Sequence, residues 1–259
     1  MGRLLVLLYG VAGYAVGMGA LLYLILFAVA LPGLPLPITV DSGAPASLGI
    51  ALAVNIGLAA LFGLQHSIMA RPGFKAAWTK IVPPAAERST FIMATGIVVA
   101  LLVVFWQPVA GSVWSVENET ARIALYALAL AGFGFTAACS FIIDHFDLFG
   151  LRQVWLHFRG RPYTQLQFKS GLVYRNIRHP LMTGLLIAFW STPEMTASHL
   201  MLAVLMTAYI LVGVAYEERD LIRAFGQAYT DYRARVPAYF PNPFKRGENR
   251  DSGAPASAK

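Results

Sequence analysis

Residues 4–31 read LLVLLYGVAGYAVGMGALLYLILFAVAL, and none of these side chains is acidic or basic. Three further uncharged runs follow, at residues 48–64, 91–106 and 123–143. A helix needs about 20 apolar residues to cross the hydrocarbon core of a bilayer. The first run is also longer than the apolar part of a removed signal peptide, which has about 7–15 residues. The four runs therefore predict membrane-spanning helices, and we expect the lipid bilayer to be a partner of the chain.

The composition agrees with a membrane protein and argues against other classes. The chain is 57% hydrophobic and 13% charged, whereas an average soluble domain is about 25% charged. Its net charge of +7 comes from basic residues between the apolar runs, so we expect no nucleic-acid partner. The single cysteine, Cys139, lies inside the fourth run. This position excludes a disulfide framework, and the pattern suggests no metal site.

The distribution of Lys and Arg predicts which segments face the cytoplasm. Basic residues gather in segments 69–90 and 144–179 and in the C-terminal tail, whereas segment 32–47 has none and segment 107–122 has only Arg122. An excess of Lys and Arg marks the cytoplasmic side of a membrane protein. We therefore expect the N-terminus, both basic segments and the C-terminal tail to be cytoplasmic.

A fifth apolar stretch, residues 180–216, is interrupted by Thr192-Pro193-Glu194. As one straight helix it would be about 55 Å long, well beyond a hydrocarbon core of about 30 Å. A single crossing would also put the basic tail outside. The sequence therefore predicts an all-α polytopic membrane helical bundle with five hydropathy spans, the last of which is a broken helical hairpin with Pro193 at its turn.

Both ends of this hairpin carry charged residues, which are costly at a membrane and often serve a ligand or a reaction. Arg178-His179 precede Pro180, which suits the first position of a helix. Glu217-Glu218 come at the other end, where the helix dipole disfavours an acid. The two carboxylates need cations nearby, and the basic motif is the obvious source. The cluster is either a salt bridge that holds the hairpin together or a binding site, and both can be true.

The two motifs, followed by Leu221, Phe225-Gly226, Tyr229, Tyr232 and Val236-Pro237, resemble the C-terminal signature of membrane methyltransferases of the isoprenylcysteine carboxyl methyltransferase type. The resemblance covers residues 163–243 and implies that a cytoplasmic site binds S-adenosylmethionine. Met182 stands where the family has a tyrosine, and Val214 where the prenylcysteine enzymes have a substrate-binding arginine, so the resemblance does not extend to a prenylcysteine acceptor. Residue by residue, it implies cofactor contacts at Gln167, Leu172, Val173, Tyr174, Arg178, His179, Pro180, Met182, Gly184 and Glu218.

Residues 65–74, 82–90 and 144–153 resemble a second group, the bacterial methanethiol S-methyltransferases, and a related membrane family named for nitric-oxide reduction. This resemblance implies a bacterial inner (cytoplasmic) membrane protein that transfers a methyl group from S-adenosylmethionine to methanethiol, giving dimethyl sulfide. Two alternatives remain open. One is the same fold methylating another small thiol, a lipid or an isoprenoid, and the other is a non-enzymatic accessory protein linked to nitric-oxide reduction.

A thiol acceptor needs a group that lowers the cost of forming its thiolate, because the thiolate is the nucleophile. A histidine base or a nearby cation can do this. Each candidate also has a structural interpretation, as a helix-to-helix hydrogen bond, a cap or an ion pair. The candidate catalytic residues at the cytoplasmic face are His66, Arg71, Glu87, Arg88 and Asp147.

We expect three parts in the chain. Residues 1–143 form a four-helix membrane portion, residues 144–250 form the cofactor-binding loop, hairpin and tail, and residues 251–259 form a disordered tail. The first run also has closely spaced glycines, which indicate close helix packing inside the chain or in a homo-oligomer. These glycines are Gly10, Gly13, Gly17 and Gly19.

Overall fold

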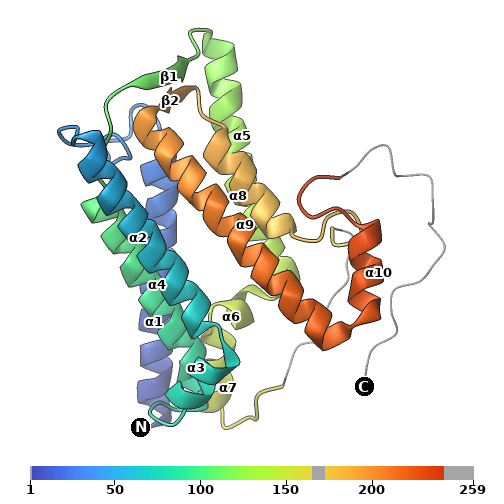
Figure 1. Cartoon of the computed structure of the whole chain (residues 1–259). Helices are drawn as coiled ribbons and strands as arrows, with labels where there is room; N and C mark the ends of the chain where they lie inside the picture. Colours follow the sequence, from blue (N-terminus) through green and yellow to red (C-terminus); the bar gives the residue numbers. More distant parts are fainter. Residues whose placement is uncertain (1, 165–172, 242–259) are drawn as a thin grey trace.

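The computed structural model describes residues 2–164 and 173–241 and shows a bundle of helices (Figure 1). The predicted disordered tail, residues 251–259, lies outside the described residues. The elements are α1 Arg3–Val29, α2 Leu48–Met69, α3 Pro72–Trp78, α4 Pro84–Phe105, β1 Ser112–Ser115, α5 Glu119–Ile143, α6 His145–Leu148, α7 Leu151–Phe158, α8 Pro180–Trp190, β2 Glu194–Thr196, α9 Ala197–Phe225 and α10 Gln227–Arg235.

Five helices are long and apolar enough to cross a membrane: α1, α2, α4, α5 and α9. They correspond to the first four apolar stretches of the sequence and to the second part of the fifth, whose first part forms the shorter helix α8. The predicted all-α polytopic membrane bundle is confirmed. Helix α5 begins at Glu119, ahead of the uncharged run at residues 123–143, because Asn118 caps it. The Asn118 side-chain oxygen accepts a hydrogen bond of 2.9 Å from the Ala121 amide.

The fifth stretch is divided as its interruption predicts. Helix α8 ends at Trp190, the turn contains Pro193, and α9 runs back from Ala197 (Figure 1). Strand β2 in this turn pairs antiparallel with β1, with Ser115 opposite Glu194. Arg122 at the start of α5 forms an ion pair of 2.7 Å with Glu194. The turn is therefore fastened to the segment that leads into α5.

The main hydrophobic core lies toward the β1–β2 end of the bundle. It joins Phe27 of α1, Leu102 of α4, Phe133 of α5, Phe189 of α8 and Leu202 of α9, all nearly inaccessible to solvent. Five helices thus share one apolar interior, which fixes the position of both arms of the hairpin.

The glycines of α1 allow close packing within the chain. A Cβ on Gly17 would come within 2.4 Å of Ile92 on α4, and a Cβ on Gly10 within 2.4 Å of Val154 on α7. Gly13 faces the backbone of Ser89, whereas Gly19 has nothing within 4 Å. Three of the four glycines therefore serve contacts of α1 with α4 and α7.

The bundle has two ends that differ in charge. Helices α3 and α7, from the two basic segments, lie at the end where the N-terminus is found (Figure 1). Strand β1 and the segment after α1, both poor in Lys and Arg, lie at the opposite end. This separation fits the loop charges, and we refer to the two ends as the basic end and the β end.

Candidate cofactor and acceptor sites

The Arg-His-Pro motif is held at the start of α8 by the segment that follows α10. The amide of Arg178 donates to the carbonyl of Pro237, and the amide of His179 donates to the carbonyl of Ala238, both at 2.9 Å. Thr183, one turn into α8, donates its hydroxyl to the carbonyl of Tyr239. The C-terminal segment therefore fixes the main chain of Arg178 and His179 independently of their side chains.

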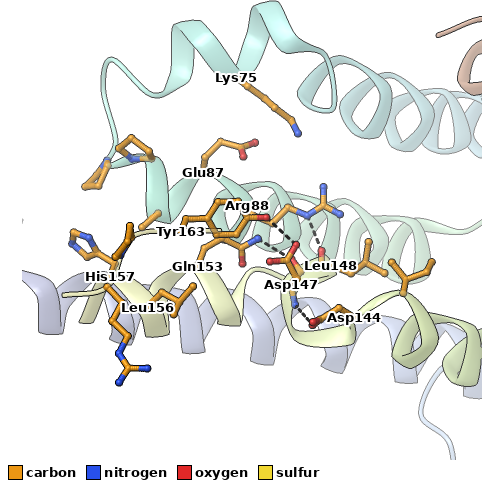
Figure 2. A pocket seen from close by; sticks show the side chains of 16 residues that line it. Lys75, Glu87, Arg88, Asp144, Asp147, Leu148, Gln153, Leu156, His157 and Tyr163 are labelled. Carbon is orange, nitrogen blue, oxygen red and sulfur yellow. Dashed lines mark hydrogen bonds between the residues drawn. The ribbon is translucent and has the colours of Figure 1, made fainter. Parts of the chain in front are cut away.

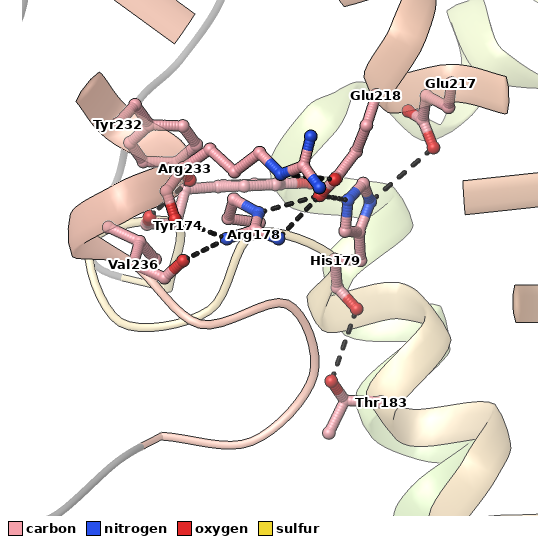
Figure 3. Close-up of polar contacts among 9 residues, drawn as sticks. All are labelled: Tyr174, Arg178, His179, Thr183, Glu217, Glu218, Tyr232, Arg233 and Val236. Carbon is pink, nitrogen blue, oxygen red and sulfur yellow. Dashed lines mark hydrogen bonds and ion pairs between the residues drawn. The ribbon is translucent and has the colours of Figure 1, made fainter. Parts of the chain in front are cut away.

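Glu218 is the centre of the polar cluster (Figure 3). The Arg178 Nε donates a hydrogen bond of 2.8 Å to its Oε1, and the His179 Nε2 lies 3.1 Å from the same oxygen. The Arg233 Nε forms an ion pair of 3.1 Å with the other oxygen, Oε2. Glu217 is exposed and lies 3.5 Å from the His179 Nδ1. Glu218 thus has the cationic partners that its position requires, and Glu217 lies beside the His179 ring.

The Glu218 side chain is only 8% exposed, and those of Arg178 and His179 are 10% and 6% exposed. A buried carboxylate is costly unless it is paired and hydrogen-bonded. Here it is both, so the cluster links the start of α8 to α9 at the end of the hairpin opposite to Pro193. The predicted salt bridge that holds the hairpin together is therefore present, and a binding role for the same residues remains compatible with it.

Tyrosines surround this cluster from α10 and from the segments beside it. Burial raises the pKa of Tyr229 to about 12, and the Glu218 carboxylate acts in the same direction. Burial likewise raises the pKa of Tyr174 and Tyr232 to about 12. The Tyr232 hydroxyl donates to the carbonyl of Tyr174 at 2.7 Å. These phenols stay neutral at physiological pH and offer ring faces and hydroxyls beside a carboxylate pair.

The other residues for which the resemblance implies cofactor contacts do not all lie beside the cluster. Val173 and Pro180 flank the cluster in the chain, and Met182 is half-buried in α8. Gly184 has a packing role, because a Cβ there would lie 2.4 Å from the Thr136 hydroxyl on α5. Gln167 and Leu172 lie outside the described residues.

A second site is a cavity of about 660 Å³ at the basic end, between α3, the start of α4, the α5–α6 junction, and α7 with the residues that follow it (Figure 2). Three of the five candidate catalytic residues line it, namely Glu87, Arg88 and Asp147. The sequence had not singled out its other polar lining groups, which include Lys75, Gln153, His157 and Tyr163.

Hydrogen bonds position the acid and the arginine in this cavity. Arg88 Nε donates to the carbonyl of Leu148 at 2.7 Å. Asp147 accepts from Arg152 at 2.9 Å and from the Tyr163 hydroxyl at 3.2 Å. The side-chain oxygen of Asp144 accepts from the Asp147 amide at 3.0 Å and caps α6. The expected cap and ion pair are therefore both present, and the Asp147 carboxylate is fixed at the cavity wall.

The structure does not bring His66 and Arg71 into this cavity. The ring of His66 lies between aromatic rings, 4.7 Å from Phe91 and 6.1 Å from Tyr209 between centroids. Its buried Nδ1 has no hydrogen-bond partner among the described residues. Arg71 forms an exposed ion pair of 2.5 Å with Asp220 of α9. The five candidates thus separate into a cavity group and two residues on the α2 side of α9.

The sequence reasoning missed Arg233 and the carbonyls that hold the motif. Arg178 donates through Nη1 to the carbonyls of Arg233 and Val236, the first at 2.8 Å. A backbone carbonyl has no sequence signature. The only available signal was the basic run around Arg233 and Arg235, which the charge rule had already used to explain the topology.

The chain is similar to known proteins over most of its length. The chain is 44% identical over 245 residues to a protein named methanethiol S-methyltransferase from Mycobacterium tuberculosis, covering 95% of this chain and 99% of that one. It is 43% identical to methanethiol S-methyltransferase 2 of Bradyrhizobium diazoefficiens, covering 98% and 96%. A more distant relative is Nurim of Sus scrofa, at 27% identity over 68% of this chain and 70% of that one.

No family model and no solved structure matches the chain. The bacterial relatives alone are decisive, because their identity exceeds 40% over nearly the full length of both chains. The chain, with its apolar helices and its paired Arg-His-Pro and Glu-Glu motifs, therefore belongs to the methanethiol S-methyltransferase family.

Proposed function

We propose that the chain transfers the methyl group of S-adenosylmethionine to methanethiol and so produces dimethyl sulfide. The observation that carries the cofactor part is the buried Glu218, surrounded by cations and tyrosines. The names of the bacterial relatives support methanethiol as the acceptor.

The residues of the cluster fit the cofactor in charge and shape. S-adenosylmethionine carries an ammonium, a carboxylate and a sulfonium whose methyl group it donates. Glu217 and Glu218 supply negative charge for its cations, and Arg178 and Arg233 supply positive charge for its carboxylate. Ring faces such as that of Tyr229 attract cations through their quadrupole. We therefore propose cofactor contacts at Tyr174, Arg178, His179, Pro180 and Glu218, with Gln167, Leu172, Val173, Met182 and Gly184 as further proposals from the resemblance.

The acceptor part is a proposal about the basic end. A thiol must lose its proton and be held in line with the methyl group, and positioning alone can contribute about 7–11 kcal/mol to such a step. We propose that Arg88 and Asp147 polarise the thiol in the cavity and that Glu87 controls access to it. Arg71 and His66 are retained as proposed acceptor-side groups, and the unpaired Nδ1 of His66 is a candidate proton acceptor.

The size of the cavity favours testing a wider range of thiols. Cavities of about 300–1,000 Å³ commonly hold drug-sized molecules, and this one is about 660 Å³. Methanethiol would occupy a small part of it. Methylation of thiols larger than methanethiol is therefore a second candidate function for the same site.

We also propose that the chain lies in a bacterial inner membrane with both termini in the cytoplasm. The loop charges support this orientation. The division into residues 1–143 and 144–250 remains a proposal, and both portions contact each other where α8 packs on α5. Self-association through α1 remains a proposal as well, and the packing of Gly10, Gly13 and Gly17 inside the chain weakens its basis.

The direct test supplies the purified protein with S-adenosylmethionine and a panel of thiols and measures the volatile sulfides in the headspace. We expect dimethyl sulfide from methanethiol, with S-adenosylhomocysteine in equal amount. A farnesylcysteine analogue and a lipid extract serve as competing acceptors. Methylation of either of these, with no dimethyl sulfide formed, would refute the proposed acceptor.

A further inference from the structure

The two carboxylate oxygens of Glu218 have unlike partners (Figure 3). Oε1 is shared by Arg178, whose Nε and Nη2 lie at 2.8 and 2.7 Å, and by His179 at 3.1 Å. Oε2 has one partner among the described residues, the Nε of Arg233 at 3.1 Å. A ligand that needs a carboxylate here can reach it most easily by replacing the single partner of Oε2.

The partners also differ in how firmly they are held. Arg178 is 10% exposed and is tied by Nη1 to two backbone carbonyls, and the His179 amide is bonded to Ala238. The Arg233 side chain is 50% exposed. Its half-exposed guanidinium can be hydrated when it leaves Oε2, so its release costs less than the release of the buried Arg178 would. Of the three side chains that contact the Glu218 carboxylate, Arg233 is therefore the exchangeable one.

The main chain of Arg233 does not need to move during such an exchange. Its carbonyl accepts the Arg178 Nη1 at 2.8 Å, which anchors the end of α10 to the motif. Rotation of the Arg233 side chain alone would withdraw its guanidinium from Oε2. The guanidinium would then remain next to the ligand group that takes its place.

We propose that Arg233 is an exchangeable counter-ion for an α-amino-acid group. In the ligand-free chain it occupies the place of a ligand's α-ammonium on Oε2 of Glu218. When the ligand binds, the ammonium takes that place and the guanidinium pairs with the neighbouring α-carboxylate. The inference rests on the proposed function, since the amino-acid end of S-adenosylmethionine is the group concerned.

The charges of the cluster support this exchange. The amino-acid end of the ligand is a zwitterion and adds no net charge to the cluster, so the charges of this end and of the cluster remain paired: the ammonium with Glu218 and the carboxylate with Arg233. A ligand with the ammonium but no carboxylate would leave the Arg233 cation unpaired beside a second cation, which is unfavourable. Arg233 therefore acts both as a partner for the carboxylate and as a filter against amines that lack one.

The experiment measures the dissociation constants of S-adenosylmethionine and decarboxylated S-adenosylmethionine for the full chain in detergent micelles. The variants are Arg233→Ala, Arg233→Lys and, as a matched control, Arg235→Ala. Arg235 is on the same helix, and its Nε bonds to the carbonyl of Asp231 within that helix. 5′-Methylthioadenosine, which lacks the amino-acid group, reports whether the rest of the site is intact.

We expect the unaltered chain to prefer S-adenosylmethionine over its decarboxylated form, and Arg233→Ala to reduce this preference about tenfold. Part of the reduction should come from tighter binding of the decarboxylated form, because the variant leaves Oε2 free. Arg233→Lys should keep most of the preference, and Arg235→Ala and the binding of 5′-methylthioadenosine should be unchanged.

The possible failures are distinct. If the unaltered chain binds S-adenosylmethionine and Arg233→Ala keeps the full preference, the exchange is wrong and the proposed function stands. Weaker binding of the decarboxylated form to Arg233→Ala would also overturn the exchange, because it would make Arg233 a structural support. If the unaltered chain binds neither sulfonium ligand, the proposed function falls and the inference falls with it.

Discussion

The Arg178 Nε donates a hydrogen bond of 2.8 Å to Oε1 of Glu218 across a separation of 40 residues in the chain. This bond joins the start of α8 to the end of the apolar part of α9, so it closes the hairpin at the end opposite to Pro193. The same carboxylate is the proposed partner of the cofactor ammonium. If that proposal holds, the closure of the hairpin and the binding of the cofactor share one buried charge.

The first prediction concerns that charge. Glu218→Gln keeps the shape of the side chain but removes its charge, and we expect the dissociation constant of S-adenosylmethionine to rise about 10- to 100-fold, because hydrogen bonds to charged groups contribute about 1.5–3 kcal/mol. Isothermal titration calorimetry on the monodisperse protein measures it. The control is Asp231→Asn, an α10 carboxylate bonded to Gln227. Equal affinities for the folded Glu218→Gln protein and the unaltered chain would remove Glu218 from the cofactor site.

The second prediction concerns orientation. Because Cys139 is the single cysteine and is buried, a Cys139→Ser background allows one new cysteine to be tested at a time. We expect a membrane-impermeant maleimide to label Ser112→Cys, in β1, on intact spheroplasts. Lys80→Cys, after α3, and Arg223→Cys, at the end of α9, should react only after permeabilisation. Labelling of Arg223→Cys from outside would mean that residues 180–216 cross the membrane once, contrary to the hairpin.

The sequence was sufficient to predict the membrane helices, because the length of each uncharged apolar run can be read directly from it. Residues 4–31 and 123–143 correspond to α1 and α5 within a few residues, and Pro193 lies in the turn of the hairpin. The attraction between the Arg-His-Pro motif and the Glu pair also followed from their positions at the two ends of that hairpin. These features depend on neighbours in sequence or on simple charge pairing.

Contacts between distant segments were not predictable in this way. The carbonyls of Pro237 and Ala238 hold the amides of Arg178 and His179, and backbone groups are the same in every residue. Arg71 pairs with Asp220 on α9 and does not line the cavity, and a single sequence gives no pairing signal for this contact. The expectation that these residues lie on the same side of the membrane was therefore too weak a criterion to define one acceptor site.

The third prediction tests the close packing of α1 on α4. A Cβ on Gly96 would lie 2.9 Å from both the Gly17 Cα and the Val16 carbonyl oxygen, and backbone atoms cannot yield easily. We expect Gly96→Ala to destabilise the protein by about 1–3 kcal/mol through overpacking. Thermal unfolding followed by light scattering or intrinsic fluorescence in detergent measures this loss. The control is Gly19→Ala, where nothing lies within 4 Å; equal Tm values for the two variants would contradict the packing.

The fourth prediction concerns pH. His145 is buried at the α5–α6 junction, where its ring nitrogens contact the Tyr14 hydroxyl and the Ser140 hydroxyl, each at 2.9 Å. Burial lowers the pKa of His145 below its ordinary value of 6.5, although the Asp144 carboxylate acts in the opposite direction. The unfolded chain therefore binds a proton more readily than the folded one, and stability falls as the pH drops below about 6.5.

The measurement for His145 is Tm between pH 7.5 and 5. We expect Tm to fall toward acid in the unaltered chain and to fall less in His145→Gln, which retains hydrogen-bonding groups but cannot be protonated in this range. The variant should be less stable at pH 7.5, where the neutral imidazole makes its contacts. An equal acid dependence in both proteins would mean that other groups, such as carboxylates, cause the loss.

The last prediction separates the two groups of candidate acceptor residues. Arg88 and Asp147 line the cavity and are fixed by hydrogen bonds to Leu148 and Arg152, whereas Arg71 contacts Asp220 at the surface. If the cavity holds the thiol, Arg88→Ala and Asp147→Ala should lower kcat at least about 100-fold, a typical contribution of a positioned acid, base or charge, while the dissociation constant of S-adenosylmethionine changes little. Arg71→Ala should change kcat less than tenfold, because it removes only an exposed ion pair.

His66→Ala decides between the cavity and the α2 side of α9 as the place where the thiol loses its proton. Its Nδ1 is buried without a described partner beside Phe91, and the Arg88 guanidinium carbon lies 4.6 Å from the centroid of the same ring. A loss of kcat in His66→Ala that shrinks as the pH rises would identify the imidazole as the base, because the thiol then ionises without help. A pH-independent loss would instead assign His66 a packing role among the rings. If each of the three single variants His66→Ala, Arg88→Ala and Asp147→Ala keeps full turnover, the acceptor binds elsewhere in the chain.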